Sequence, residues 1–141
     1  MEALGFLRMT VLDTYAAEPD ACARPMVLVV EDEILIRMMV SESLRQAGCE
    51  VVEAASADEA LEVLELSASP DVLVTDVKMP GSVDGLELAS RVRKTLPGLK
   101  VVITSGHALA QNTFGLADAF LAKPFGLDQL VGQVRALVDA A

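Results

Sequence analysis

The chain alternates short continuous apolar runs with longer stretches in which apolar residues recur every three or four positions. Continuous runs rich in β-branched residues are typical of strands buried on both faces, whereas the longer spacing is typical of amphipathic helices. Strands are predicted at residues 26–30, 49–54, 72–75, 99–104 and 119–122. Helices are predicted at residues 34–47, 56–66, 86–96 and 127–138, with Ser56 and Glu59 as a capping box on the second.

Strand and helix alternate along the chain, and the alternation weakens only at residues 108–117, where a fourth helix is predicted to be short or disordered. Strand–helix–strand connections are right-handed in nearly all proteins, so units of this kind build a parallel sheet with helices on both faces. The predicted fold class is therefore α/β: a flavodoxin-like, doubly wound, five-stranded parallel sheet.

Composition and charge narrow the classes of function. The 141 residues suffice for one domain with a full core, and a hydrophobic content of 52% excludes a disordered chain. A net charge of −10 argues against a nucleic-acid surface and against binding to anionic membranes. No apolar run is long enough to span a bilayer, and Cys22 and Cys49 lack metal-ligand spacing. We therefore expect reduced thiols in a cytoplasmic protein.

Residues 1–25 differ from the rest of the chain. Apolar residues allow a short helix near residues 3–15, but Gly5 and the proline-containing stretch at 19–25 weaken it. We expect residues 1–25 to be an N-terminal extension, either a short helix or disordered, and residues 26–141 to form the domain.

Polar residues stand at the ends of four predicted strands. They are Glu31 and Asp32, Asp76, Thr104 and Ser105, and Lys123. The carboxyl ends of parallel strands share one edge of the sheet, so these groups are expected to converge on one crevice. Closely packed carboxylates repel, and Mg²⁺ relieves that repulsion while keeping waters and binding phosphate oxygens. A lysine and a hydroxyl beside it are then placed to contact a phosphoryl group carried by one carboxylate.

Four motifs occupy these strand ends in order: Val-Val-Glu-Asp-Glu, Val-Thr-Asp-Val-Lys-Met-Pro-Gly, Ile-Thr-Ser-Gly-His and Leu-Ala-Lys-Pro-Phe. Together they resemble a two-component response-regulator receiver domain, over about residues 26–140. The resemblance implies a stand-alone phosphorelay receiver whose partner is a sensor histidine kinase or a histidine phosphotransferase, with Mg²⁺ as cofactor. It implies no enzyme activity beyond catalysis of its own phosphorylation and dephosphorylation.

The resemblance also implies roles for the residues of the crevice. Asp76 matches the phosphoacceptor, which takes the phosphoryl group from phosphohistidine, and Lys123 matches the lysine that pairs with the phosphoryl oxygens. Glu31 and Asp32 match the acidic metal ligands. Asp76 and the backbone carbonyl of Lys78 complete the implied metal shell.

Two further residues match the family's switch. Ser105, in competition with the adjacent threonine, matches the hydroxyl that moves to the phosphoryl group, and Phe120 matches the aromatic residue that then turns inward. This motion is expected to change a surface that binds partners. On the first predicted helix, we expect Met39 to pack in the core. Leu35 and Met38 are expected to be exposed where receivers dock kinase helices.

The chain departs from the family pattern in three places, the first being Glu31, where aspartate is commoner. The loop at residues 80–84 is one residue longer than in simple receivers, and the segment between Ser105 and Lys123 is several residues shorter. The main alternative is a pseudo-receiver, a docking or dimerisation module that is not phosphorylated, and a homodimer stays open in either case. A hydrolase acting through an aspartyl phosphate is disfavoured, because Lys78 stands where such enzymes have a second aspartate two residues after the nucleophile.

Overall fold

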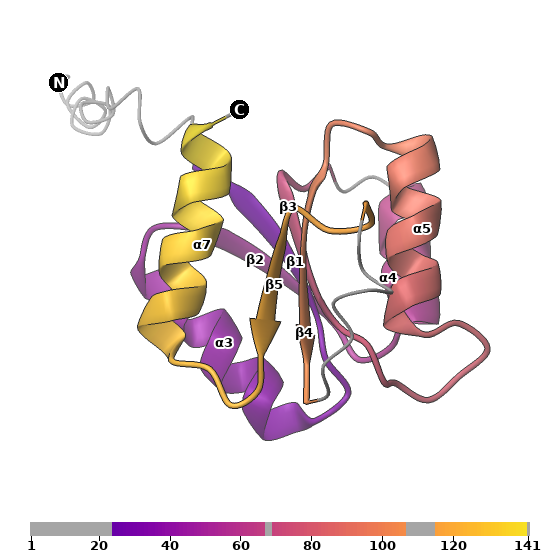
Figure 1. Ribbon diagram of the computed structural model, residues 1–141, viewed down its shortest axis with the longest axis horizontal. Helices are drawn as coiled ribbons and strands as arrows, with labels where there is room; N and C mark the ends of the chain where they lie inside the picture. Colours follow the sequence, from indigo (N-terminus) through magenta and orange to yellow (C-terminus); the bar gives the residue numbers. More distant parts are fainter. Residues whose placement is uncertain (1–23, 67–68, 107–114, 141) are drawn as a thin grey trace, which may run out of the picture.

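The computed structural model describes residues 24–66, 69–106 and 115–140. Within them, five parallel strands form one sheet in the order β2-β1-β3-β4-β5 (Figure 1). The strands are β1 (Met26–Val30), β2 (Glu50–Ala54), β3 (Val72–Asp76), β4 (Lys100–Ser105) and β5 (Ala119–Ala122). The predicted α/β, doubly wound, flavodoxin-like sheet is confirmed. The uncertain helix at 108–117 and most of the N-terminal extension lie outside the described residues.

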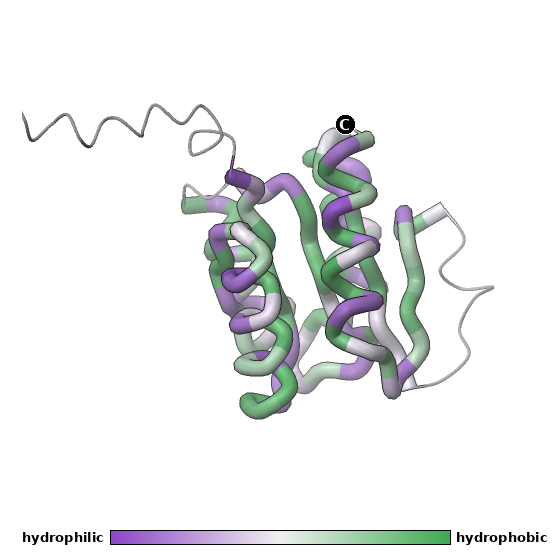
Figure 2. Tube along the Cα trace, turned by 90° about the vertical axis from the view of Figure 1, so that its left-hand side faces the viewer, coloured by the Kyte–Doolittle hydropathy of each residue, from purple (hydrophilic) through white to green (hydrophobic). Residues whose placement is uncertain are grey.

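Helices cover both faces of the sheet. The helices α3 (Ile34–Gln46) and α7 (Leu127–Asp139) lie on one face, and α4 (Ala57–Leu66) and α5 (Gly85–Thr95) lie on the other (Figure 1). Hydrophilic and hydrophobic residues alternate along these helices (Figure 2), because each helix presents one side to the sheet and the other to solvent. No helix among the described residues has the length and apolar character needed to cross a membrane.

The core consists of two layers, one on each face of the sheet. Successive strand residues point to opposite faces, so Leu28 packs toward α4 and α5 whereas Val29 packs toward α3 and α7. Both layers are closed by helix residues, including Leu88 on one side and Leu44 and Leu130 on the other. The strands are therefore apolar along most of their length, and their polar residues are displaced to the strand ends.

Local signals in the sequence set the helix ends. Gly48 adopts a φ of 98°, a left-handed conformation that favours glycine, just after the last turn of α3. The predicted capping box at α4 forms in part. The Glu59 N–H donates to Ser56 Oγ at 3.1 Å, but the Glu59 carboxylate accepts from the N–H of Ala55 at 2.6 Å, one residue before the position expected.

The expectation that Met39 packs in the core is wrong. Its side chain is 55% exposed, because the inward face of α3 is occupied by Val40 and Leu44, four residues apart. Met39 precedes Val40 by one position, which turns it toward the edge of the helix. There it lines a pocket with Ile36 and Phe125.

The buried hydroxyl of Ser41 generates a prediction about stability. Ser41 is 0% exposed on the inner side of α3, and its Oγ has no hydrogen-bond partner in the part of the chain that the structure describes. An unsatisfied buried hydroxyl lowers stability, so Ser41→Ala should raise the free energy of unfolding by about 1 kcal/mol, measured by urea denaturation. Leu44→Ala, a truncation on the same face, should lower it by about 3 kcal/mol. A loss of stability in Ser41→Ala would contradict this interpretation.

Candidate functional site

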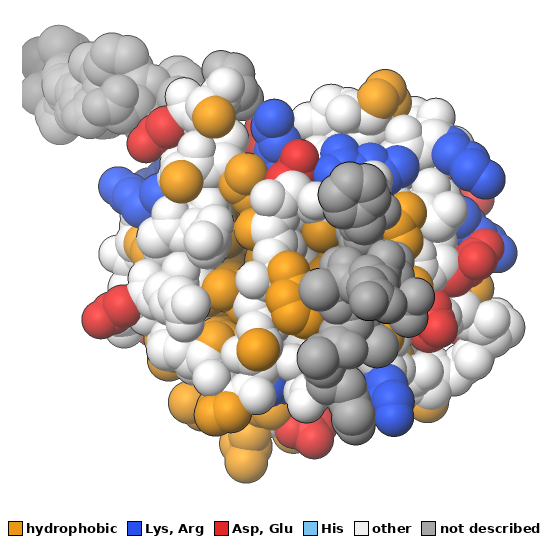
Figure 3. All heavy atoms as spheres, viewed as in Figure 1, with side chains coloured by type: hydrophobic (Ala, Val, Ile, Leu, Met, Phe, Trp, Pro, Cys, Tyr) orange, Lys and Arg blue, Asp and Glu red, His pale blue; other side chains and the backbone are white. Residues whose placement is uncertain are grey.

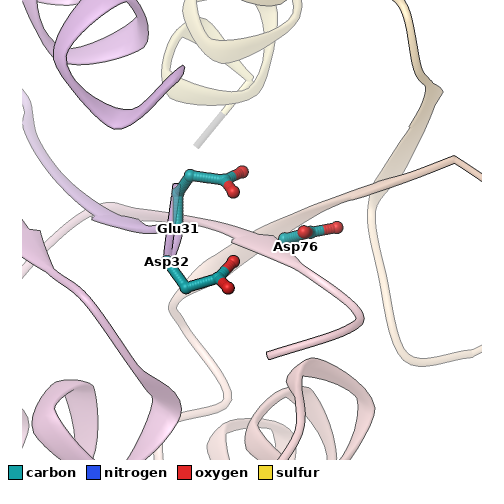
Figure 4. A group of neighbouring side chains, drawn as sticks. All are labelled: Glu31, Asp32 and Asp76. Carbon is teal, nitrogen blue, oxygen red and sulfur yellow. The ribbon is translucent and has the colours of Figure 1, made fainter. Parts of the chain in front are cut away.

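Three carboxylates meet at the carboxyl edge of the sheet, the lower edge in Figure 1. Val30 of β1 is paired with Thr75 of β3, so Glu31 and Asp76, the next residues on each strand, are neighbours. Asp32 follows, and one carboxylate oxygen from each of these three acidic residues lies within 4.8 Å of the others. Figure 4 shows the three side chains near one another at the ends of β1 and β3.

Lys123 brings a positive charge to the same place from the opposite part of the sheet. Its Nζ lies 3.2 Å from Asp76 Oδ2 and 3.2 Å from Glu31 Oε1. The N–H of Lys123 donates to the carbonyl oxygen of Ser105 at 2.7 Å, and the peptide bond to Pro124 is cis. Lys123 therefore bridges the two buried carboxylates while its backbone is held by β4.

The surroundings of these groups change their proton affinities. Burial raises the pKa of Glu31 above its ordinary value of 4.5 and repulsion from Asp76 adds to this, although the N–H of Glu33 and the charge of Lys123 offset part of the rise. Burial alone would lower the pKa of Lys123, but attraction and hydrogen bonds from Asp76 and Glu31 outweigh it and raise the pKa above 10.5. The site thus holds a firmly charged ammonium beside crowded carboxylates.

Asp76 is fixed by its backbone and remains only slightly accessible. Its side chain accepts a hydrogen bond from the N–H of Val77 at 2.8 Å, and that N–H also lies 3.2 Å from the Thr104 carbonyl oxygen. A β-carbon at position 85 would overlap the Asp76 carbonyl oxygen, so Gly85 allows α5 to begin directly against this strand end. Asp76 is 8% exposed, whereas Asp32 is exposed at the mouth of the site.

The structure also places the remaining predicted residues. Ser105 is buried at the end of β4, one residue beyond Thr104, which is paired with Asp76. Phe120 is half-buried against the core layer beneath α4 and α5. Lys78 lies in the loop after β3, has an exposed side chain, and lines a pocket together with Asp32.

Arg37 supports the site and was not predicted from the sequence. Its NH1 group donates to the Glu31 carbonyl oxygen at 2.9 Å, and its Nε contacts the Glu53 carboxylate at 3.2 Å. It therefore joins the turn that carries the acidic pair to β2. The sequence signal for Arg37 was a basic residue one helical turn after the acidic run at residues 31–33. This arrangement is common on solvent-exposed helices, so by itself it does not indicate a functional site.

The donor set fits a hard divalent cation. The three clustered side chains offer only carboxylate oxygens, the ligands that Mg²⁺ prefers, and among the described residues no histidine or cysteine joins the cluster. The exposure of Asp32 leaves room for the waters and substrate oxygens that complete an octahedral shell around this ion. The three carboxylates together carry more negative charge than the Lys123 ammonium compensates, and this excess also favours binding of Mg²⁺.

Comparison with known proteins identifies the family. Residues 27–135 match the response regulator receiver domain. The chain belongs to the response regulator receiver family. Receivers of this kind are the signalling domains of two-component systems, and the pseudo-receiver alternative is not favoured.

Individual relatives agree with this assignment. The chain is 43% identical over 118 residues to the sensor kinase CckA of Brucella abortus, covering 80% of this receiver but 12% of that protein. It is 38% identical over 126 residues to the transcriptional regulatory protein PdtaR of Mycobacterium tuberculosis, covering 86% of this receiver and 60% of PdtaR. The chain thus spans less than two thirds of each of these relatives.

One solved structure of similar fold is a complex with Mg²⁺-BeF. The response regulator TrrA from Thermotoga maritima, in complex with Mg²⁺-BeF, has a TM-score of 0.73 and 31% sequence identity to this receiver. The likeness covers 80% of this receiver and 98% of TrrA.

The raised pKa of Glu31 predicts a pH dependence of stability in the metal-free protein. Folding favours the protonated carboxyl, so this group lowers the free energy of unfolding as pH rises above 4.5 toward neutrality. Glu31→Gln cannot ionise and should lack this part of the decline. Urea denaturation in a chelator, with Glu33→Gln as the control for net charge, measures the difference. The prediction would be contradicted if the free energy of unfolding changed with pH in the same way in the wild type and in Glu31→Gln.

Proposed function

We propose that this receiver takes a phosphoryl group onto Asp76 from a phosphohistidine of a histidine kinase or histidine phosphotransferase. In this proposal it catalyses its own phosphorylation and dephosphorylation with Mg²⁺. The observation that carries the proposal is the contact between Lys123 Nζ and Asp76 Oδ2 at 3.2 Å, beside the clustered oxygens of Glu31 and Asp32. The carboxylate proposed as nucleophile, a cation and two candidate metal ligands thus lie close together.

The chemistry follows from these positions. A carboxylate oxygen of Asp76 attacks phosphorus, the phosphorus–nitrogen bond breaks, and the departing imidazole keeps the electron pair and takes up a proton. Negative charge on the phosphoryl oxygens is stabilised by the Lys123 ammonium, which exchanges its contacts with carboxylates for contacts with phosphate. Burial of the strand end behind Asp76 keeps these interactions strong.

Glu31, Asp32, Asp76 and the backbone carbonyl of Lys78 are the residues proposed to hold Mg²⁺. When bound, the ion supplies positive charge to the attacking carboxylate and the phosphoryl oxygens. The Mg²⁺-BeF complex of TrrA supports this assignment, because a protein of the same family and fold binds the metal together with a phosphoryl analogue.

The proposed output is a change of surface. Phosphorylation adds charge and acceptor oxygens beside the end of β4, and the Ser105 hydroxyl is proposed to move toward them. Phe120, already packed on the core layer beneath α4 and α5, is proposed to turn further inward as the end of β4 shifts. The surface that changes then includes the neighbourhood of β5.

The proposed phosphodonor contact lies at the start of α3. Leu35 is 70% exposed and Met38 is 54% exposed, next to the acidic turn. Figure 3 shows hydrophobic side chains gathered at this lower edge of the molecule. An apolar patch beside the phosphoacceptor suits a helix that carries a phosphohistidine, and the net charge of −10 favours a protein partner over nucleic acid.

Phosphorylation at Asp76 is directly testable. Incubation with acetyl phosphate and Mg²⁺ should produce a phosphorylated band on a phosphate-affinity gel for the wild type and none for Asp76→Asn, because an amide cannot form the acyl phosphate. Asp71→Asn is the matched control. Asp71 precedes β3 at the opposite end of the same strand, where it accepts a hydrogen bond from the N–H of Met26 at 2.9 Å.

Labelling of the wild type and of Asp71→Asn is expected, each dependent on Mg²⁺. Equal labelling of Asp76→Asn would place the phosphoryl group on another residue. A wild type that stays unlabelled with acetyl phosphate, and unshifted in NMR spectra by beryllofluoride and Mg²⁺, would instead support the docking module. Turnover of many phosphate esters would favour a hydrolase.

A further inference from the structure

The loop at residues 80–84 is tied to helix α4 by one carboxylate, that of Asp58. Asp58 lies in the first turn of α4, 24 residues before Ser82 in the sequence. Its Oδ1 accepts from the Ser82 hydroxyl at 2.9 Å, and its Oδ2 accepts from the Ser82 N–H at 3.2 Å. A single side chain therefore holds both the backbone and the side chain of one loop residue.

The loop backbone lies directly against this carboxylate. Gly81 has a φ of 113°, in the left-handed region, and a β-carbon there would lie 2.6 Å from Asp58 Oδ2. Glycine thus lets the chain turn toward the carboxylate, so that the next residue can donate twice. The loop path and Asp58 are complementary in shape as well as in hydrogen bonding.

Residues 77–80, which follow Asp76, form a wall beside the proposed cation site. They line a pocket together with Asp32, one of the proposed metal ligands, and Asp84. Both ends of the loop are anchored separately. The Gly85 N–H donates to the Val77 carbonyl oxygen at 2.9 Å, and Asp84 caps α5 by accepting from the Glu87 N–H at 2.8 Å.

These anchors leave the middle of the loop to be fixed by Asp58. Each residue whose backbone is ordered costs conformational entropy, and a loop segment without contacts to the rest of the protein has many conformations available. A wall held in one conformation presents its backbone carbonyl groups to a cation without further ordering. A loose wall must be ordered at the moment of binding, which lowers affinity.

We propose that Asp58 and Ser82 are positioning residues that hold the wall containing Lys78 and thereby raise the affinity of the site for Mg²⁺. This inference rests on the proposed function, in which the acidic pocket binds that ion. Neither residue touches the metal in this proposal. Their effect passes through the backbone of residues 77–81.

Calorimetric titration of the metal-free protein with Mg²⁺ tests the proposal. Asp58→Ala should weaken binding about tenfold, the lower end of the effect of residues that orient metal ligands. Glu42→Ala is the matched control, since it removes a carboxylate of equal charge from α3, where it accepts from Gln46 Nε2 at 3.2 Å. The control should bind Mg²⁺ as the wild type does.

Two further variants separate positioning from charge and from a folding defect. Asp58→Asn loses the charge but keeps an acceptor for the Ser82 hydroxyl, so it should retain most of the affinity. Ser82→Ala changes no charge at an exposed position and should weaken binding in part. The effect of Ser82→Ala on Mg²⁺ affinity should be smaller in an Asp58→Ala background than in the wild type.

Hydrogen exchange of the metal-free protein tests the loop directly. The Ser82 amide should exchange its hydrogen faster in Asp58→Ala than in the wild type, while amides of the core strands remain protected.

The outcomes are distinguishable. Wild-type affinity in both Asp58→Ala and Ser82→Ala would overturn the inference while leaving the proposed function intact. Equal losses in Asp58→Asn, Asp58→Ala and Glu42→Ala would assign the effect to charge alone and would also overturn it. A wild type that binds no Mg²⁺ would overturn the proposed function itself.

Discussion

The ammonium of Lys123 between the carboxylates of Glu31 and Asp76 is the interaction on which the site depends. Two carboxylates removed from water at one sheet edge lose hydration and repel each other, and one nearby cation compensates for part of both effects. The compensation is incomplete, because Asp32 adds a third negative charge at the mouth. The protein can fold with this residual charge, and the same charge attracts a divalent cation. The contact that lets two buried carboxylates lie together therefore also leaves the negative charge that suits the proposed cation.

Sheet topology makes this interaction between distant parts of the chain. Lys123 is 92 residues from Glu31 and 47 residues from Asp76 in sequence. The order β2-β1-β3-β4-β5 places the acidic strands β1 and β3 side by side, and β4 holds the backbone of Lys123. The apolar strands and two core layers carry no chemistry themselves. They keep the strand ends at fixed separations, so that charged side chains meet without having to be ordered when a ligand arrives.

Much of this was predictable, because strand periodicity and strand-end polarity are local properties. The runs that became β1 to β5 and the convergence of Glu31, Asp76 and Lys123 follow from composition and from the geometry of parallel sheets. The prediction for Met39 failed because apolar spacing defines a helix face only to within about one residue, and both its neighbours are also apolar.

Some contacts around the site could not be predicted, because no sequence pattern indicates them. The hydrogen bond from Arg37 to the Glu31 carbonyl oxygen, and those from Ser82 to Asp58, depend on the path of a loop or turn past another element. A sequence pattern records which side chains are polar, but it does not record which backbone atom lies next to them. The sequence predicts a loop at residues 80–84, but it contains no signal for the attachment of that loop to α4.

A crystal structure of the protein grown with Mn²⁺ as an anomalous substitute for Mg²⁺ tests the central claim most directly. The account predicts one strong anomalous peak within bonding distance of carboxylate oxygens from Asp32 and Asp76, with the Lys123 ammonium still directed at the Asp76 side chain. A metal bound elsewhere, an empty acidic cluster, or a Lys123 side chain turned away from Asp76 would contradict it.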